Sequence, residues 1–121
     1  MKRSMMQVYV KGSNEAVSLY KKAFDAQLIS EYKNDDGTYM HAELDVNGQI
    51  ISLSEAIEDV IPGNTMQFCF HYGEGYEKEI EKAYKILKED GKVLIPLGEC
   101  FFSPLMMGII DKFGVNWCLF I

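Results

Sequence analysis

The sequence predicts an α+β fold made of two tandem βαβββ modules, whose curved mixed sheets enclose a cleft. Three observations support this prediction: short strands interrupted by one helix in each half, an Asn-Gly hairpin turn, and an internal repeat. The chain has 121 residues, which fits a single domain over residues 1–121, and 48% of them are apolar. That apolar content is sufficient for a core at this size.

The first module is expected over residues 1–56. The apolar residues of the segment Asn14–Phe24 fall at helical spacing, and Ser13 is placed to cap that helix. Asn47-Gly48 is the strongest local signal in the chain, because this dipeptide is typical of two-residue hairpin turns. Strands are expected at Met5–Val10, Ala26–Tyr32, Tyr39–Val46 and Gln49–Leu53.

A polar link over residues 57–63 leads to the second module, residues 64–121, where the same order of elements returns. A helix is expected at Tyr76–Leu87 and ends before Gly91. Strands are expected at Thr65–His71, Lys92–Ile95, Glu99–Phe102, Met106–Ile110 and Asn116–Ile121.

The two modules also match residue by residue. Met6–Val10 resembles Met66–Phe70 at an offset of 60 positions, with Gln7 matching Gln67. The closing hairpins match at an offset of 66, which aligns Ser52-Leu53 with Cys118-Leu119. The order of these matches indicates a duplicated unit with pseudo-twofold symmetry.

Strand alternation separates two faces of each expected sheet. One face is uniformly apolar and should pack under the helix; it holds Val8, Val10, Ala42, Leu44, Val46, Ile51, Leu53, Phe68, Phe70, Trp117 and Leu119. The other face is mixed in polarity, and such a face on two curved sheets would enclose a small-molecule cleft. The expected cleft residues are Gln7, Tyr9, His41, Glu43, Ser52, Ser54, Gln67, Cys69, Phe101, Phe102, Cys118 and Phe120.

Composition disfavours several classes of function. The net charge is −6 and no run of Lys or Arg occurs, which disfavours nucleic-acid binding. No apolar stretch approaches the roughly 18 residues of a membrane span, and no secretory leader is recognisable. The three cysteines have no CxxC spacing, so a reduced, cytoplasmic protein with buried thiols is expected.

The segments VYVKGSNEAVSLYKKAFDAQL, GTYMHAELDVNGQIISLSEA and FFSPLMMGIIDKFGVNWCLF resemble the vicinal oxygen chelate superfamily, and within it the PhnB-like group. The resemblance covers essentially the whole chain. It implies the glyoxalase/bleomycin-resistance fold and a homodimer. It leaves the activity open, because members include isomerases, dioxygenases, thiol transferases and drug-sequestering proteins.

The resemblance also implies where a metal would bind, on the first and last strands of each module. The matching positions are Met5 or Gln7, Ser52, Gln67 and Cys118. A hydroxyl, neutral amides and one thiol are a poor donor set for a hard divalent ion. We therefore expect no metal and no cofactor.

His41 and Glu43 offer a different chemistry, since both point into the expected cleft from one strand. A histidine beside a carboxylate can act as a general base, although both side chains can equally well just line a polar sheet face. Ser103-Pro104 suggests a loop at the pocket mouth, where Phe101 and Phe102 form either a pocket wall or a dimer contact.

The expected function is thus metal-free binding of a small organic molecule. The alternatives are a lyase, isomerase or dioxygenase-type enzyme of this superfamily and, less favoured, a protein-interaction module.

Overall fold

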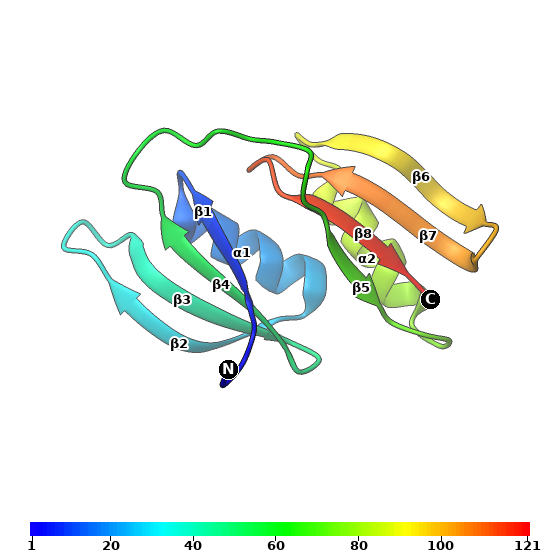
Figure 1. Ribbon diagram of the computed structural model, residues 1–121, viewed down its shortest axis with the longest axis horizontal. Coiled ribbons are helices and arrows are strands. Elements are labelled where there is room, and N and C mark those ends of the chain that lie inside the picture. Colours follow the sequence, from blue (N-terminus) through cyan, green and yellow to red (C-terminus); the bar gives the residue numbers. More distant parts are fainter. The chain divides into compact units, whose positions relative to one another are not determined.

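Each half of the chain folds as β-α-β-β-β, as the sequence predicts (Figure 1). The computed structural model describes residues 1–121, and these form two units, Met1–Ile61 and Pro62–Ile121. Each unit has one four-stranded mixed sheet, with one parallel and two antiparallel strand pairs. The fold class and the tandem modules are therefore confirmed.

The first module contains strand β1 (Met6–Val10), helix α1 (Ser13–Phe24) and strands β2 (Gln27–Lys33), β3 (Tyr39–Val46) and β4 (Gln49–Glu55). The strand order is β1-β4-β3-β2, with β1 parallel to β4. Asn47 and Gly48 both have positive φ, 49° and 87°, as the predicted hairpin turn between β3 and β4 requires.

The second module contains β5 (Phe68–His71), α2 (Glu77–Leu87), β6 (Lys92–Cys100), β7 (Ser103–Ile110) and β8 (Asn116–Phe120). Its strand order, β5-β8-β7-β6, repeats that of the first module. Neither helix has the length or the apolar content to cross a membrane.

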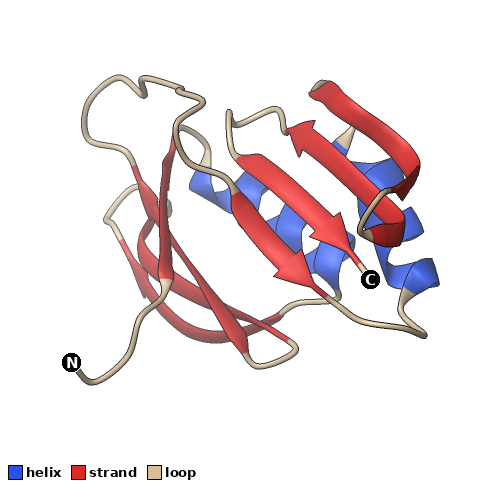
Figure 2. Ribbon diagram, turned by 45° about the vertical axis from the view of Figure 1, so that its right-hand side comes forward, coloured by secondary structure: helices blue, strands red, loops and turns tan.

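In each module the helix packs on one face of the sheet (Figure 2). The predicted apolar face is confirmed as core: its residues on β1, β3, β4 and β8 are all buried. The two exceptions are Phe68 and Phe70, which are half-buried on the edge strand β5 and contact the Trp117 ring, with centroids 5.7 and 5.8 Å away. The opposite face of each sheet is called the open face below, because it carries no helix of its own module.

The prediction of two short strands at Lys92–Ile95 and Glu99–Phe102 was wrong. They form the single strand β6, which is interrupted by irregularities in register on either side of Pro96. An edge strand tolerates proline because the side facing away from the sheet needs no hydrogen bonds. The predicted loop at Ser103-Pro104 was also wrong: both residues begin β7, and Ser103 Oγ lies 2.6 Å from the carbonyl of Ile121.

The start of α1 differs from the prediction. Ser13 does not cap the helix; its Oγ accepts a hydrogen bond from the Tyr39 N–H at 2.9 Å. Gly12 is the N-cap residue, with a φ of 91°. The Glu55 carboxylate accepts hydrogen bonds from the N–H groups of Gly12 and Ser13, at 3.1 and 2.8 Å. An acidic side chain from β4 thus satisfies donors that the helix leaves unpaired.

The internal repeat is confirmed as architecture, but strand register shows that the predicted offsets of 60 and 66 do not hold together. Gln7 pairs with Ser52 across β1 and β4, whereas Cys69 pairs with Cys118 across β5 and β8. With Ser52 aligned to Cys118, the counterpart of Gln7 is Cys69; with Gln7 aligned to Gln67, the counterpart of Ser52 is Asn116, which Gln67 bonds. A shift of two residues preserves the face on which a side chain lies, so the predicted faces still hold.

Candidate functional site

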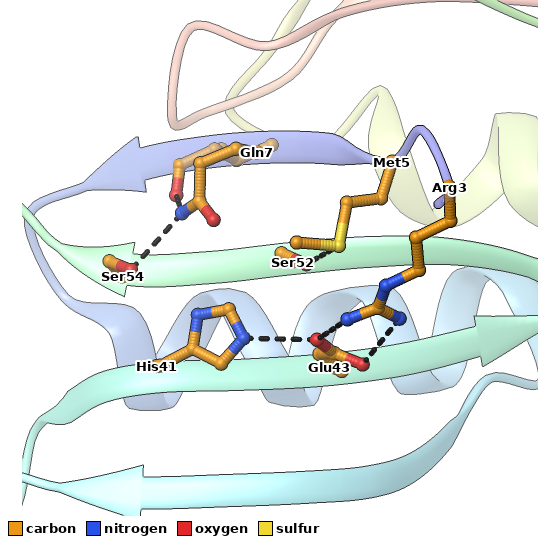
Figure 3. A network of polar contacts seen from close by, with 8 residues as sticks. Arg3, Met5, Gln7, His41, Glu43, Ser52 and Ser54 are labelled. Atoms are coloured by element: carbon orange, nitrogen blue, oxygen red, sulfur yellow. Dashed lines mark hydrogen bonds and ion pairs between the residues drawn. The ribbon is translucent and has the colours of Figure 1, made fainter. Parts of the chain in front are cut away.

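The open face of the first module carries polar side chains in rows across the sheet. Strand pairing aligns Gln7, Ser52, Glu43 and Ser30 in one row. Figure 3 shows Gln7, Ser52, Ser54, His41 and Glu43 on the side of the sheet away from α1. The pleat of the strands places these alternate residues on one face, as the sequence pattern predicts.

An ionic network joins the centre of this face to the residues before β1. Arg3 binds the Glu43 carboxylate with both terminal nitrogens, at 2.8 and 3.2 Å. His41 Nε2 lies 3.1 Å from Oε1 of the same carboxylate (Figure 3). Glu43 itself is buried, with 8% of its surface exposed. The hydrogen bond from Arg3, followed by that from His41, lowers the pKa of Glu43, so this carboxylate stays ionised at neutral pH.

Arg3 was not predicted as a site residue, although the sequence carries a signal for it. Arg3 precedes the first strand by three residues and shares the odd numbering of Met5, Gln7 and Tyr9. Continuing the alternation past the strand end would have placed Arg3 on the open face. Its Glu43 partner is 40 positions away, and only the pairing of the sheet brings the two together.

Neutral contacts hold the rest of this face. Gln7 Nε2 donates to Ser54 Oγ at 3.1 Å, and Ser52 Oγ donates to Met5 Sδ at 3.3 Å. Ser52 is completely buried. Two pairs of predicted residues, Gln7 with Ser54 and His41 with Glu43, are thus joined directly, while Ser52 and Glu43 also bond to Met5 and Arg3 before β1.

An open cavity of about 860 Å³ lies beside the end of this face. It is lined by Tyr9, Asn34, Met40, Ser54, Glu55, Ala56, Ile57, Glu58, Asp59, Val60 and Ile61. Two of these, Tyr9 and Ser54, were predicted as cleft residues, while residues 56–61 were predicted only as the end of the first module and part of the link. The apolar residues of that segment, Ile57 and Ile61, are the signal that it does more than connect.

The open face of the second module has a different chemistry. Cys69 on β5 and Cys118 on β8 are register partners. The next residue of this row is Gly108 on β7, and a side chain at that position would contact Ile95 on β6. In the adjoining row His71 stacks on Phe120, with ring centroids 4.6 Å apart. The first open face has the Glu43 carboxylate, the Gln7 amide and two serine hydroxyls, whereas the second has thiols and stacked rings.

The structure places the predicted site residues in two groups. Gln7, Tyr9, His41, Glu43, Ser52 and Ser54 share the open face of the first module. Cys69, Cys118 and Phe120 share that of the second, Gln67 bonds Asn116 just before β5, and Phe101 and Phe102 form the turn between β6 and β7. Phe101 is fully exposed, while Phe102 contacts Phe120 edge-on at 5.4 Å. A single cleft lined by all twelve stays a prediction.

The residues at the positions implied for a metal do not fit a hard divalent ion. Ser52 directs its hydroxyl to a thioether, and Gln67 donates its amide hydrogen to Asn116 at 3.0 Å. Burial, followed by the neighbouring Cys69 thiol, raises the pKa of Cys118 to about 11, so this side chain is an uncharged thiol at neutral pH. A metal that binds cysteine binds the thiolate and not the neutral thiol. A hard divalent ion prefers anionic oxygen ligands, and this donor set has none.

Comparison with known families shows which superfamily this chain belongs to. A family model described as the Glyoxalase/Bleomycin resistance protein/Dioxygenase superfamily matches residues 3–119. The chain belongs to this superfamily. Among curated proteins no sequence matches it.

Several solved structures have the same fold as this chain. A PhnB protein from Bacillus cereus is 26% identical, with a TM-score of 0.82 and 98% of each chain covered. The protein PA1353 from Pseudomonas aeruginosa is 22% identical, with a TM-score of 0.79, over 99% of this chain and 97% of that one. The fosfomycin resistance protein FosX from Listeria monocytogenes, solved with Mn(II) and 1S,2S-dihydroxypropylphosphonic acid, is 13% identical, with a TM-score of 0.74, over 98% and 90%.

Proposed function

We propose that this member of the glyoxalase superfamily is a PhnB-like protein that binds a small organic molecule without a metal ion. The observation that carries the proposal is the cavity of about 860 Å³ beside the open face of the first module. Its size lies within the range of about 300–1,000 Å³ that is typical of ligand pockets. It joins apolar side chains to the polar groups at the end of β4, as a specific ligand site requires.

The lining of the cavity favours an amphipathic ligand. Tyr9, Met40 and Ile57 are all more than half exposed, so a bound apolar group would remove a large apolar area from water. Glu55, Glu58 and Asp59 line the same cavity, and no basic side chain does. A neutral or cationic polar group is therefore favoured over an anionic one.

Substitution of Tyr9 tests this proposal. The full chain would be screened for ligands by thermal shift, and hits would be mapped by NMR chemical shifts. Tyr9→Ala should weaken binding of a mapped ligand about 5- to 30-fold, because burying an aromatic side chain contributes about 1–2 kcal/mol. Tyr32→Ala is the matched control, since both tyrosines are 61% exposed but Tyr32 lies outside the cavity lining. Equal affinity of the two variants would contradict the assigned site.

The metal-free part of the proposal is tested on the same sample. The purified protein would be analysed for bound metal before and after incubation with nickel, zinc, manganese and iron(II). Retention of about one metal per chain would overturn the proposal, because it would require donors that the positions of Ser52 and Cys118 do not provide. Light scattering of this sample also tests the homodimer that the family resemblance implies.

The Arg3–Glu43–His41 network favours an enzyme as the second candidate. Glu43 is held by Arg3 and can orient the His41 imidazole, which leaves the other ring nitrogen to accept a proton from a ligand. If this candidate is correct, a bound ligand with a C–H group beside a carbonyl exchanges that hydrogen for solvent deuterium. His41→Ala should lower the exchange rate at least 100-fold. No exchange in any bound ligand removes the candidate.

A further inference from the structure

All three cysteines lie in the second module, and two of them face each other. Cys69 on β5 and Cys118 on β8 are register partners in a parallel strand pair. Register partners lie on the same face of a sheet, and neighbouring strands are about 4.8 Å apart. A disulfide spans Cα atoms about 4.4–6.8 Å apart, so the spacing of neighbouring strands suits a bond between these two side chains.

The two thiols differ in their access to solvent. Cys69 is exposed, whereas only 4% of the surface of Cys118 is exposed. Cys69 Sγ contacts Gln67 Oε1 at 3.8 Å, and its thiol is free of any disulfide. A dissolved oxidant therefore reacts with Cys69 first, and Cys118 lies beside it on the neighbouring strand as the second sulfur. Burial, followed by the nearby thiols of Cys69 and Cys100, raises the pKa of Cys118 to about 11, so Cys118 is a protonated thiol at neutral pH.

We propose that Cys69 and Cys118 form a reversible intramolecular disulfide on the open face of the second module. With hydrogen peroxide as the oxidant, the Cys69 thiolate attacks one peroxide oxygen, the O–O bond breaks, and the departing hydroxide takes up a proton to become water. Cys69 is then a sulfenic acid. Cys118 attacks this sulfur and loses its proton; the S–S bond forms, the S–O bond breaks, and a second water leaves. The two sulfurs lose two electrons, and one peroxide is reduced to two waters.

The bond would change the chemistry of the face. It consumes both thiols in the row that also contains Gly108 and ties the edge strand β5 covalently to β8. In the reduced protein the face offers an exposed nucleophile; in the oxidised protein it offers an uncharged disulfide. The inference does not depend on the ligand proposed for the first module.

Thiol counting on the folded full chain tests the proposal. After treatment with hydrogen peroxide, the protein would be unfolded, labelled with a maleimide and mapped by mass spectrometry. The number of free thiols should fall from three to one, with the label on Cys100, and dithiothreitol should restore all three. The result should be the same at two protein concentrations tenfold apart, because the bond is intramolecular.

Variants make the test specific. Cys100→Ser should still lose both remaining thiols, whereas Cys69→Ser should form no intramolecular bond; Cys69 is exposed, so this change leaves the core intact. Three labelled thiols after oxidation would overturn the proposal. So would a bond to Cys100, or a Cys69 sulfinic acid beside an unreacted Cys118.

Discussion

Replacing Asp111 by alanine should lower the free energy of unfolding by about 3–5 kcal/mol. Asp111 is buried, and its carboxylate accepts three hydrogen bonds: from the N–H groups of Phe113 and Val115, at 2.8 and 3.1 Å, and from Trp117 Nε1 at 2.8 Å. Alanine leaves these donors without that acceptor. Each buried donor left unpaired costs about 1–3 kcal/mol, and partial relaxation keeps the total below the simple sum.

Trp117 is the single tryptophan of the chain and reports on this site directly. Urea unfolding followed by its fluorescence should show a lower midpoint in Asp111→Ala. Asp45→Ala is the matched control from the first module: Asp45 also precedes a hairpin turn, but it is half-buried and accepts one turn N–H, from Gly48. That variant should lose less than about 1.5 kcal/mol. Equal losses in the two variants would show that the additional contacts of Asp111, to Val115 and Trp117, contribute nothing.

Glu55→Ala should cost about 1–2 kcal/mol, because it removes the side chain that satisfies the first N–H groups of α1. The loss of amide protection should be confined to the start of α1, where Glu55 accepts its hydrogen bonds. Hydrogen exchange of the amides of Gly12 and Ser13 should speed up, together with a lower urea midpoint by far-UV circular dichroism. Glu58→Ala is the control, since Glu58 lines the same cavity but is exposed. If both variants have the same stability, the capping role assigned to Glu55 is wrong.

The contribution of Glu55 should also depend on pH. Burial alone would raise the pKa of this carboxyl group, but hydrogen bonds from the backbone of Ser13 and Gly12 outweigh burial and lower it. A carboxyl group with a lowered pKa in the folded state stabilises that state above its unfolded pKa, about 4.5, and loses the contribution as the pH falls through the folded value. The difference in stability between the protein and Glu55→Ala should therefore be full at pH 7 and shrink below about pH 4.

The sequence predicted the elements well because the signals for elements are local. The Asn47-Gly48 turn, the alternation of Tyr39–Val46 and the helical spacing of α1 each depend on residues that are near one another in the chain. The errors arose where a local signal competes with position in the sheet. Pro96 reads as a strand breaker, but β6 is an edge strand and retains it.

The candidate site was predicted in part, for a related reason. Alternation alone gave the open-face positions of Gln7, His41, Glu43 and Ser52, because side chains on a strand point to opposite faces in turn. It could not give their partners, such as Arg3 for Glu43, since pairing across a sheet depends on register. The same holds for Cys69, whose partner Cys118 became visible only when the register of β5 and β8 was known.

The sequence by itself therefore determined the duplicated βαβββ plan and the faces of both sheets, which follow from local periodicity and turn chemistry. The superfamily was recognised from the resemblance of whole segments, and the family model that matches residues 3–119 confirms it. Only the tertiary structure decided that Glu55 caps α1, that Arg3 holds Glu43, and that residues 56–61 line a cavity. These contacts join residues that are tens of positions apart. Strand register and packing, which are properties of the assembled sheet, bring them together.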